Sequence, residues 1–199
     1  MNMQKFWDSY YEQAFNTGVQ ADPRFVSVME TLNLPAARAV DLGAGEGGDS
    51  FWLAEHGWNV TAVDFAESGV NRLQTTAEQR KLPITVVQAD MLSYDPAEAP
   101  DLVHLGYIHL EPAQRKRLFH RIRTMLNPAG VLCYIGMTDL KPDQLPPGVS
   151  ANLFAELESI LPLVAGMDVL IAEQGPCKVD MGNGPEHATG VTLVARKRK

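Results

Sequence analysis

The sequence has little cysteine: only Cys133 and Cys177 occur, one in an apolar stretch and the other in a segment rich in glycine and proline. Two isolated cysteines build no disulfide framework, and no metal-binding spacing surrounds them. We therefore expect no bound metal and a reducing, cytoplasmic environment.

Long apolar runs and basic charge are also missing. No run of 18 apolar residues occurs, and the first residues, MNMQKFWDSYYEQ, lack the apolar region of a signal peptide. The formal net charge is −7, and the first 110 residues hold 6 basic and 15 acidic side chains. We therefore expect neither a membrane nor a nucleic acid as partner, because nucleic-acid-binding domains usually carry basic excess. A cationic ligand fits the acidic first part.

What the sequence does contain is an alternation of short β-rich runs with helical patterns, typical of a parallel sheet with crossover helices. The five runs are ARAVDL, WNVTAVD, ITVVQAD, DLVHLGY and GVLCYIGM, and helices are predicted over 48–56, 67–80 and 112–126. Two later runs, MDVLIAE and GVTLVAR, predict a terminal antiparallel hairpin across a turn-rich segment that includes Gly175 and Pro176. Further helices are predicted over 4–15, 23–33 and about 150–162.

Acidic residues close the first three β-rich runs: Asp41, Asp64 and Asp90. Ligands of open α/β sheets bind at the carboxyl ends of the strands, so these side chains and Gly106 should meet at one edge. Such an aspartate often caps the next helix, but three acidic strand ends in register with a glycine loop make this the less favoured interpretation.

The first strand runs into a glycine loop, VDLGAGEGGDS, which satisfies two patterns. Gly43, Gly45 and Gly48 fit the G-x-G-x-x-G of dinucleotide folds, with Asp64 at the spacing of a ribose-binding carboxylate. Gly43, Gly45 and Gly47 fit the D-x-G-x-G-x-G of adenosylmethionine enzymes. The glycines alone leave both ligands open.

Charge favours the second ligand. Asp41, Glu46 and Asp49 flank the loop, and each would repel a pyrophosphate by roughly 2 to 4 kcal/mol in a partly shielded site. Adenosylmethionine carries a sulfonium and an ammonium against one carboxylate. A dinucleotide-dependent oxidoreductase nevertheless stays as the alternative that the glycine pattern supports.

The segment VDLGAGEGGDSFWLAEHGWNVTAVDFAESGV resembles the first two motifs of class I adenosylmethionine-dependent methyltransferases, especially the small bacterial group similar to tellurite-resistance and thiopurine methyltransferases. The likeness continues through QADMLSY, DLVHLGYIHLE and LNPAGVLCYIGM. Two departures stand out: Gly48 lies where this group often has arginine, and Pro128-Ala129-Gly130 replaces the usual P-G-G.

The resemblance implies a single α/β Rossmann-like domain over 1–199, with an N-terminal helical lid (1–35), a core (36–199) and a seven-stranded, mostly parallel sheet ending in an antiparallel hairpin. It also implies a methyltransferase that uses adenosylmethionine and a small-molecule acceptor, as a monomer or homodimer. A cofactor-binding but inactive subunit is a further alternative, because no general base is assignable with certainty.

The cofactor-binding residues that the resemblance implies fall into three groups. Asp41 is oriented toward the ammonium, and the loop residues Gly43, Ala44, Gly45 and Gly47 surround the methionine part. Asp64 accepts from the ribose hydroxyls with Phe65 beside the adenine, Asp90 accepts from the adenine amino group with Met91 on the ring, and Gly106 and Tyr107 close the pocket.

For catalysis, Tyr107 and His109 follow the fourth strand, near the expected acceptor. An imidazole titrates in the range useful to a general base, although His109 could simply begin the next helix. His104, in mid-strand, is expected to be a packed core residue, and Asp49 a structural residue at a helix N-terminus. The basic side chains of QRKRLFHRIR, Arg115 among them, are expected on a solvated face.

Overall fold

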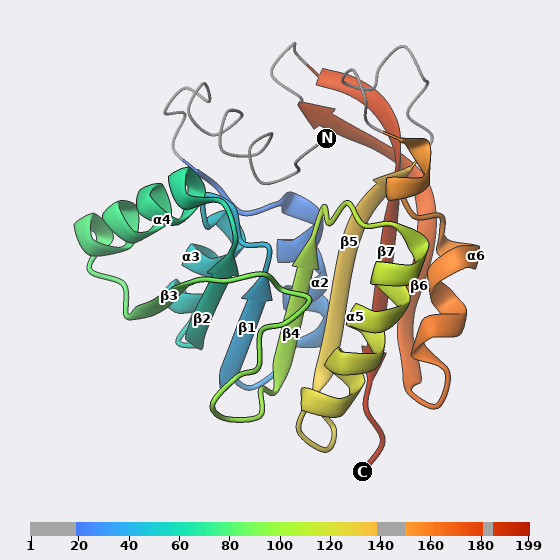
Figure 1. Ribbon diagram of the computed structural model, residues 1–199, viewed down its shortest axis with the longest axis horizontal. Helices are drawn as coiled ribbons and strands as arrows, with labels where there is room; N and C mark the ends of the chain where they lie inside the picture. The colour runs from blue at the N-terminus through green and yellow to red at the C-terminus, as the bar shows by residue number, and fades with distance from the viewer. Residues whose placement is uncertain (1–18, 139–149, 181–184) are drawn as a thin grey trace. The chain divides into compact units, whose positions relative to one another are not determined.

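The computed structural model describes residues 19–138, 150–180 and 185–199 (Figure 1). In chain order, its elements are α2 (Pro23–Leu32), β1 (Arg38–Leu42), α3 (Gly48–Glu55), β2 (Asn59–Asp64), α4 (Glu67–Arg80), β3 (Ile84–Gln88), β4 (Leu102–Gly106), α5 (Pro112–Met125), β5 (Val131–Thr138), η1 (Ala151–Leu153), α6 (Leu157–Ile160), η2 (Leu161–Val164), β6 (Asp168–Asp180) and β7 (Pro185–Arg196).

The seven strands form one sheet in the order β3-β2-β1-β4-β5-β7-β6. This arrangement confirms the expected α/β fold, with mostly parallel strands and an antiparallel hairpin at the C-terminal end. The chain divides into two compact units, with the boundary between His104 and Leu105, inside β4.

In the first unit, the register of the parallel strands brings acidic strand ends to one edge. Strand β1 pairs with β2 and β4, so that Asp41 lies opposite Ala62 on one side and His104 on the other. Strand β2 also pairs with β3, with Asp64 opposite Gln88. Because these strands run in the same direction, Asp41 and Asp64 both lie at their carboxyl ends.

Helices α3 and α4 cover the same face of β2 and β3. Phe51 of α3 and Leu73 and Ala77 of α4 are buried together against Ala62, with Val86 partly buried beside them. Full burial of a side chain such as Leu73 stabilises a fold by about 1.5 to 3 kcal/mol. This cluster therefore holds α3, and with it the glycine loop, against the strand ends.

Helix α2 begins and ends where its sequence signals lie. The side chain of Asp22 accepts hydrogen bonds from the N–H groups of Arg24 (2.7 Å) and Phe25 (3.3 Å), and Pro23 occupies the first turn, where its missing N–H costs nothing. At the other end, Asn33 adopts the left-handed conformation, with φ of 44°. The helix predicted over 23–33 is confirmed.

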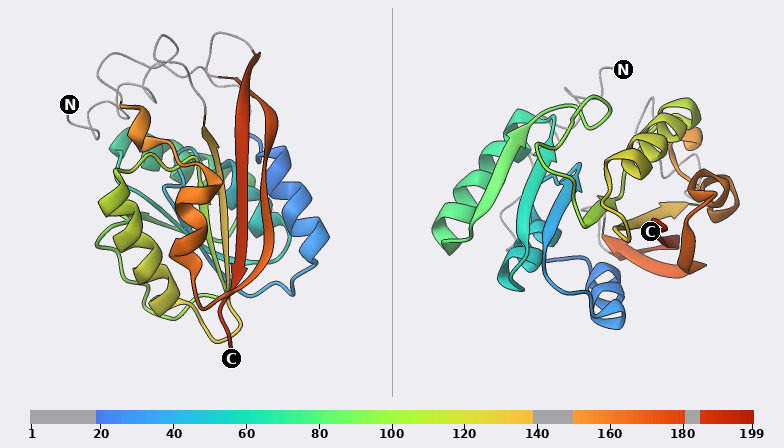
Figure 2. Two further views of the ribbon diagram at one scale, coloured as in Figure 1. Left: turned by 90° about the vertical axis from the view of Figure 1, so that its right-hand side faces the viewer. Right: turned by 90° about the horizontal axis from the view of Figure 1, so that it is seen from below.

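In the second unit, β5 is buried along its whole length and pairs antiparallel with β7, from Val131 opposite Arg196 to Thr138 opposite Thr189. Strand β6 pairs with the other side of β7, with a register shift between Val169 and Ile171. Helices α5 and α6 lie on one side of these three strands (Figures 1 and 2).

Two predicted features of the second unit were wrong. Gly175 and Pro176 lie inside β6 rather than in the turn, because β6 is the edge strand and a proline there removes no necessary ladder bond. The helix expected over 150–162 is broken into η1, α6 and η2. Phe154 is extended, with ψ of 141°, and packs its ring against Met137, so tertiary packing interrupts the helix.

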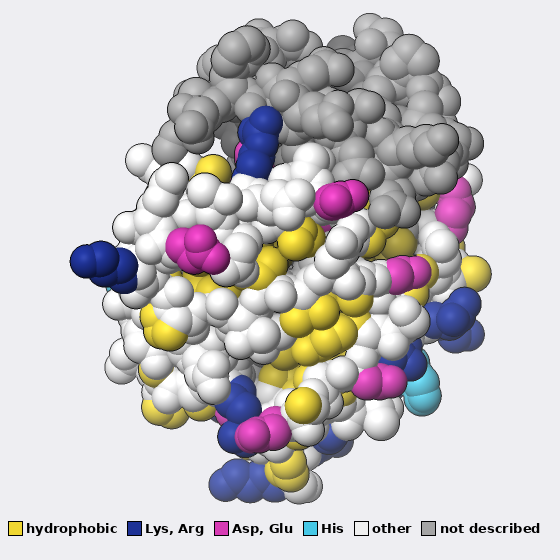
Figure 3. All heavy atoms as spheres, turned by 60° about the vertical axis from the view of Figure 1, so that its left-hand side comes forward, with side chains coloured by type: hydrophobic (Ala, Val, Ile, Leu, Met, Phe, Trp, Pro, Cys, Tyr) yellow, Lys and Arg dark blue, Asp and Glu magenta, His cyan; other side chains and the backbone are white. Residues whose placement is uncertain are grey.

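Several expectations fall on segments outside the described residues: the helix over 4–15 and most of the lid. Among the described residues, no helix has both the length and the apolar character needed to cross a membrane. Basic and acidic side chains are interspersed over the described residues on the face drawn in Figure 3.

The N-cap of α2 offers a test of the local fold. Replacing Asp22 with alanine should lower the free energy of unfolding by about 1 kcal/mol, because two N–H groups lose their acceptor. Urea denaturation measures the change. Glu30→Ala, at an exposed position on the same helix, is the control; equal small effects in both variants would contradict the capping role.

Candidate functional site

The glycine loop between β1 and α3 requires glycine at three positions. Gly43, Gly45 and Gly47 have φ of 81°, 54° and 90°, a region that other residues adopt only under strain. At Gly47 a Cβ would also lie 2.6 Å from Cγ of Leu73. The D-x-G-x-G-x-G pattern contains all three of these residues, whereas the G-x-G-x-x-G pattern contains only Gly43 and Gly45.

The hydrogen bonds of the loop distinguish between the two ligands. The N–H groups of Gly43 and Ala44 both donate to the carbonyl oxygen of Val63, at 2.7 and 3.0 Å. The N–H of Gly45 donates to Oδ2 of Asp64 at 2.8 Å. A pyrophosphate needs bare N–H groups in such a loop, and here three successive donors already bond within the protein.

Asp64 is held in place by two backbone N–H groups, one from the loop after β1 and one from the residues that follow β2. Its Oδ1 accepts from the N–H of Ala66 at 2.8 Å, while Oδ2 accepts from Gly45, and the residue is only 5% exposed. Its carbonyl oxygen accepts from the N–H of Ala89, at the end of the neighbouring strand. The carboxylate thus has one fixed orientation beside the loop, and Phe65 follows it, partly buried.

Asp41 is the most deeply buried carboxylate of the loop, with 2% exposure, and it accepts a 2.6 Å hydrogen bond from Oγ of Ser50. Burial raises the pKa of Asp41 to about 6, against a lowering by His104 and with a further raising by Asp49. A carboxylate poised near neutrality gains its charge readily when a cation approaches. Ser50 is a site residue that the sequence analysis did not identify; its position two residues into a helix after the glycines was the available signal.

The other two carboxylates of the loop have partners of their own. Glu46 forms a 2.8 Å ion pair with Arg72. Asp49 accepts from the N–H of Asp22 and lies 2.8 Å from Nε2 of His104. Asp49 and His104 are therefore structural, as expected. The repulsion of a pyrophosphate by the three carboxylates is weaker than expected, because Arg72 offsets the charge of Glu46.

The departure at Gly48 has a steric explanation. A Cβ at this position would lie 2.3 Å from the carbonyl oxygen of Gln20. An arginine therefore cannot stand here unless the segment before α2 moves away.

Asp90 is the least enclosed of the acidic strand ends. It follows β3, is exposed, and its Oδ1 accepts from the N–H of Leu92 at 2.8 Å, while its carbonyl oxygen accepts from Ser93 and Tyr94. Met91 beside it is buried, with 9% exposure. These bonds order a turn, so the capping explanation accounts for the observed contacts of Asp90.

In the second unit, the residues after Gly106 adopt an unusual backbone. Tyr107 has φ of 53°, rare for a residue other than glycine, and its N–H donates to Ile135 at 2.7 Å. Its side chain packs in a cluster with Met137 and Phe154. Such strain persists only where the surroundings enforce it, often at functional sites.

His109 lies against the same cluster, with its ring centroid 4.7 Å from that of Phe154. Burial, together with the positive charge of Arg115, lowers the pKa of His109 to about 4. This value differs from the near-neutral titration expected from the sequence. The imidazole is neutral at physiological pH, and its basicity is weak.

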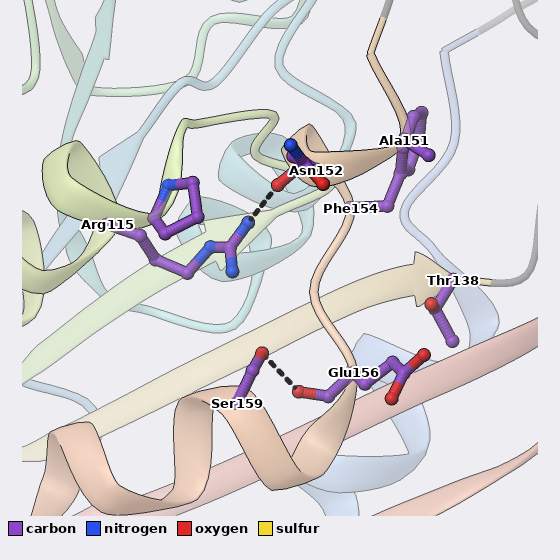
Figure 4. A pocket seen from close by; sticks show the side chains of 8 residues that line it. Arg115, Thr138, Ala151, Asn152, Phe154, Glu156 and Ser159 are labelled. Carbon is purple, nitrogen blue, oxygen red and sulfur yellow. Dashed lines mark hydrogen bonds between the residues drawn. The ribbon is translucent and has the colours of Figure 1, made fainter.

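A cavity of about 410 Å³ lies next to Phe154 (Figure 4). Its lining comes from α5, from the end of β5 and from the segment after residue 150: Pro112, Arg115, Thr138, Ala151, Asn152, Phe154, Glu156 and Ser159. Arg115 is 5% exposed, which corrects the expectation of a solvated side chain. Among the described residues, no cluster of three or more potential metal ligands occurs.

Known proteins share both the sequence pattern and the fold. Residues 39–130 match the family described as "Methyltransferase domain". "Thiocyanate methyltransferase 1" of Arabidopsis thaliana is 23% identical over 186 residues, 90% of this chain and 81% of that protein. "Ribosomal RNA small subunit methyltransferase C" of Alcanivorax borkumensis is 30% identical over 58% of this chain, which spans only 37% of that relative.

Among solved structures, N-methyltransferase NodS from Bradyrhizobium japonicum, in complex with S-adenosyl-L-homocysteine, has a TM-score of 0.76 at 17% identity, covering 100% of both chains. TehB from Haemophilus influenzae has a TM-score of 0.75 at 20% identity, covering 96% of this chain and 67% of that one. At this identity the likeness establishes the fold.

The buried Asp41 makes stability depend on pH. Its pKa is higher in the folded chain, about 6 against 3.8, so the folded state binds more protons between these values and loses stability as pH rises through them. Asp41→Asn should remove this loss, worth up to about 3 kcal/mol above pH 6. Urea denaturation from pH 4 to 7 measures it; a variant with an unchanged pH dependence would contradict the buried titration.

Proposed function

We propose that the chain is a class I adenosylmethionine-dependent methyltransferase and that it methylates a small-molecule acceptor. The observation that carries the choice of cofactor is the internal bonding of the loop: Gly43, Ala44 and Gly45 donate to Val63 and Asp64. A pyrophosphate would need these N–H groups as donors. Adenosylmethionine, whose charged groups here are a sulfonium and an ammonium, does not depend on them. No observation favours the oxidoreductase alternative.

We propose the following cofactor-binding residues in the first unit: Asp41, Gly43, Ala44, Gly45, Gly47, Asp64, Phe65, Asp90 and Met91. The buried Asp41 supplies a negative charge for the ammonium, held in one orientation by Ser50. Asp64, fixed by two backbone N–H groups, accepts from the ribose hydroxyls. Asp90 is the weakest member of this set, because its exposed side chain also orders a turn.

When bound, adenosylmethionine supplies an electrophilic methyl group on a sulfonium. The chain's main task is then to orient the acceptor, since alignment of the reacting atoms supplies much of the rate. In the second unit, Gly106 is a further proposed cofactor-binding residue, and Tyr107 and His109 are the proposed catalytic residues on the acceptor side. A neutral His109 can take a proton from an acceptor that must lose one, whereas an acceptor with a free lone pair needs no base.

A small acceptor is supported by the acidic charge of the chain, −7, and by the mixed charges in Figure 3. The relative from Arabidopsis thaliana is named for thiocyanate, while that from Alcanivorax borkumensis is named for ribosomal RNA. The lack of basic excess makes RNA the less suitable of the two classes. A single domain acting in the cytoplasm, as monomer or homodimer, is part of this proposal. A cofactor-binding but inactive subunit is the alternative, and an assay of methyl transfer to a panel of small acceptors distinguishes the two.

The cofactor is tested by isothermal titration calorimetry. S-adenosyl-L-homocysteine should bind and NAD should not, because the loop donors are engaged. Asp64→Ala should weaken binding by about 2 to 4 kcal/mol, through loss of a charged, partly buried acceptor. Glu78→Ala, exposed on α4, is the control. Binding of NAD without S-adenosyl-L-homocysteine would overturn the assignment.

The role of His109 is tested with acceptors of two kinds. His109→Ala should lower kcat about 10²-fold for an acceptor that must lose a proton, and leave a thiolate acceptor nearly unchanged. Because the folded pKa is about 4, the imidazole stays unprotonated above pH 5, so its protonation should reduce the rate only as pH falls through 4. His120→Ala, exposed on α5, is the control. A pH limb between 6 and 7 that disappears in the alanine variant at 109 would contradict this pKa.

A further inference from the structure

Arg115 is a buried cation on a helix whose neighbouring basic residues face solvent. Lys116 and Arg117, the next two residues of α5, are exposed, whereas only 5% of the surface of Arg115 is exposed. A buried charge is costly unless an opposite charge or several hydrogen bonds compensate it. The surroundings of this guanidinium therefore indicate what it is for.

Neutral carbonyl groups supply the hydrogen bonds of this guanidinium, and the charge of Glu111 acts on it only from beyond ion-pair distance. Nη2 of Arg115 donates to the carbonyl oxygens of Leu110 (2.9 Å), Asn152 (3.1 Å) and Leu153 (3.1 Å). In the described ranges these are the hydrogen bonds of its side chain, and no carboxylate there lies within ion-pair distance. Carbonyl dipoles orient the guanidinium but leave its unit charge in place, and its fork can donate up to five hydrogen bonds.

The remaining side of the guanidinium meets the cavity. Figure 4 shows Arg115 extending from α5 toward the turn at Asn152, with Thr138 and Ser159 among the other lining residues. Phe154 and Pro112 supply apolar surface. The cavity of about 410 Å³ thus combines this apolar surface with hydroxyl and amide groups and with two charged side chains, Arg115 and Glu156.

Phe154 lies between the cavity and the proposed acceptor side of the same unit. Phe154, which lines it, also contacts the ring of His109 and packs in the cluster that contains Tyr107. The residues after β4 and the cavity thus share a wall.

We propose that Arg115 anchors an anionic group, such as a carboxylate, of the methyl acceptor in this cavity. That the bound molecule is a methyl acceptor rests on the proposed methyltransferase function. The anion site itself is inferred from the buried guanidinium and the cavity alone. A guanidinium binds a carboxylate through two parallel N–H bonds, which fixes the orientation of the bound molecule. Anchoring at this end leaves the rest of the acceptor free to present its reacting atom.

Glu156 sets the limit on the charge of the ligand. Its side chain lines the same cavity but is exposed, so water screens it far more than Arg115. A monoanion at Arg115 gains more from the guanidinium than it loses to this carboxylate. Removing the charge of Glu156 should therefore tighten the binding of an anion, and removing that of Arg115 should weaken it.

The test uses benzoate and its neutral analogue benzamide, with binding followed by NMR chemical shifts on the full chain. Benzoate should bind about tenfold or more tightly than benzamide, with the shifts concentrated at residues 112–115 and 151–159. Arg115→Gln should remove the preference, Glu156→Gln should strengthen it, and Arg117→Gln, at an exposed position on α5, should leave it unchanged. Equal binding of the two probes by the native chain, or shifts confined to other residues, would overturn the proposal.

Two further measurements keep the outcomes separate. Arg115 also holds the turn at Asn152, so the benzoate preference of the native chain decides the matter if Arg115→Gln is misfolded. S-adenosyl-L-homocysteine binding, measured on the same samples, reports on the proposed function. If S-adenosyl-L-homocysteine does not bind but the preference for benzoate is present, the proposed cofactor is contradicted. If S-adenosyl-L-homocysteine binds but benzoate is not preferred, only the anion site is contradicted.

Discussion

The hydrogen bond between the N–H of Gly45 and the carboxylate of Asp64 is the constraint on which the first unit's site depends. It joins the loop after β1 to the end of β2, and it forms only because the glycines adopt positive φ. The same contact orients the carboxylate proposed to bind ribose and removes a donor that a phosphate would need. One interaction thus shapes the loop, positions an acidic side chain and narrows the choice of cofactor.

The two units bury side chains of opposite charge. The first unit encloses Asp41, with Ser50 donating to it, and the second encloses Arg115, held by backbone carbonyls. In both cases the protein supplies neutral hydrogen-bonding partners that fix orientation without cancelling the charge. Such groups cost stability in the unliganded chain, and a ligand of opposite charge recovers that cost on binding. The proposed ligands, a cationic cofactor and an anionic acceptor, match these signs.

The strand ends and the glycine loop were predictable because their signals are local. Asp22 and Pro23 mark the start of α2, and the alternation of β-rich runs with helical periods defines the sheet. Arg115 was misplaced because its helical position suggested solvent, while the segment that buries it lies 37 to 38 residues further along. The helix expected at 150–162 failed for a related reason: contacts of Phe154 with Met137, distant in sequence, decide the backbone there. Nothing local signals either contact.

The burial of Arg115 also bears on the chemistry available at His109. A cation nearby adds to desolvation in keeping the imidazole neutral, which preserves its lone pair but weakens its basicity. An anion bound at Arg115 offsets that charge, so the imidazole becomes a better base when the anchoring group is present. By this argument an acceptor that fills the cavity improves the base that would deprotonate it, whereas a neutral molecule meets a histidine of low basicity. Selection for a charged group and activation of the acceptor would then follow from the same arginine.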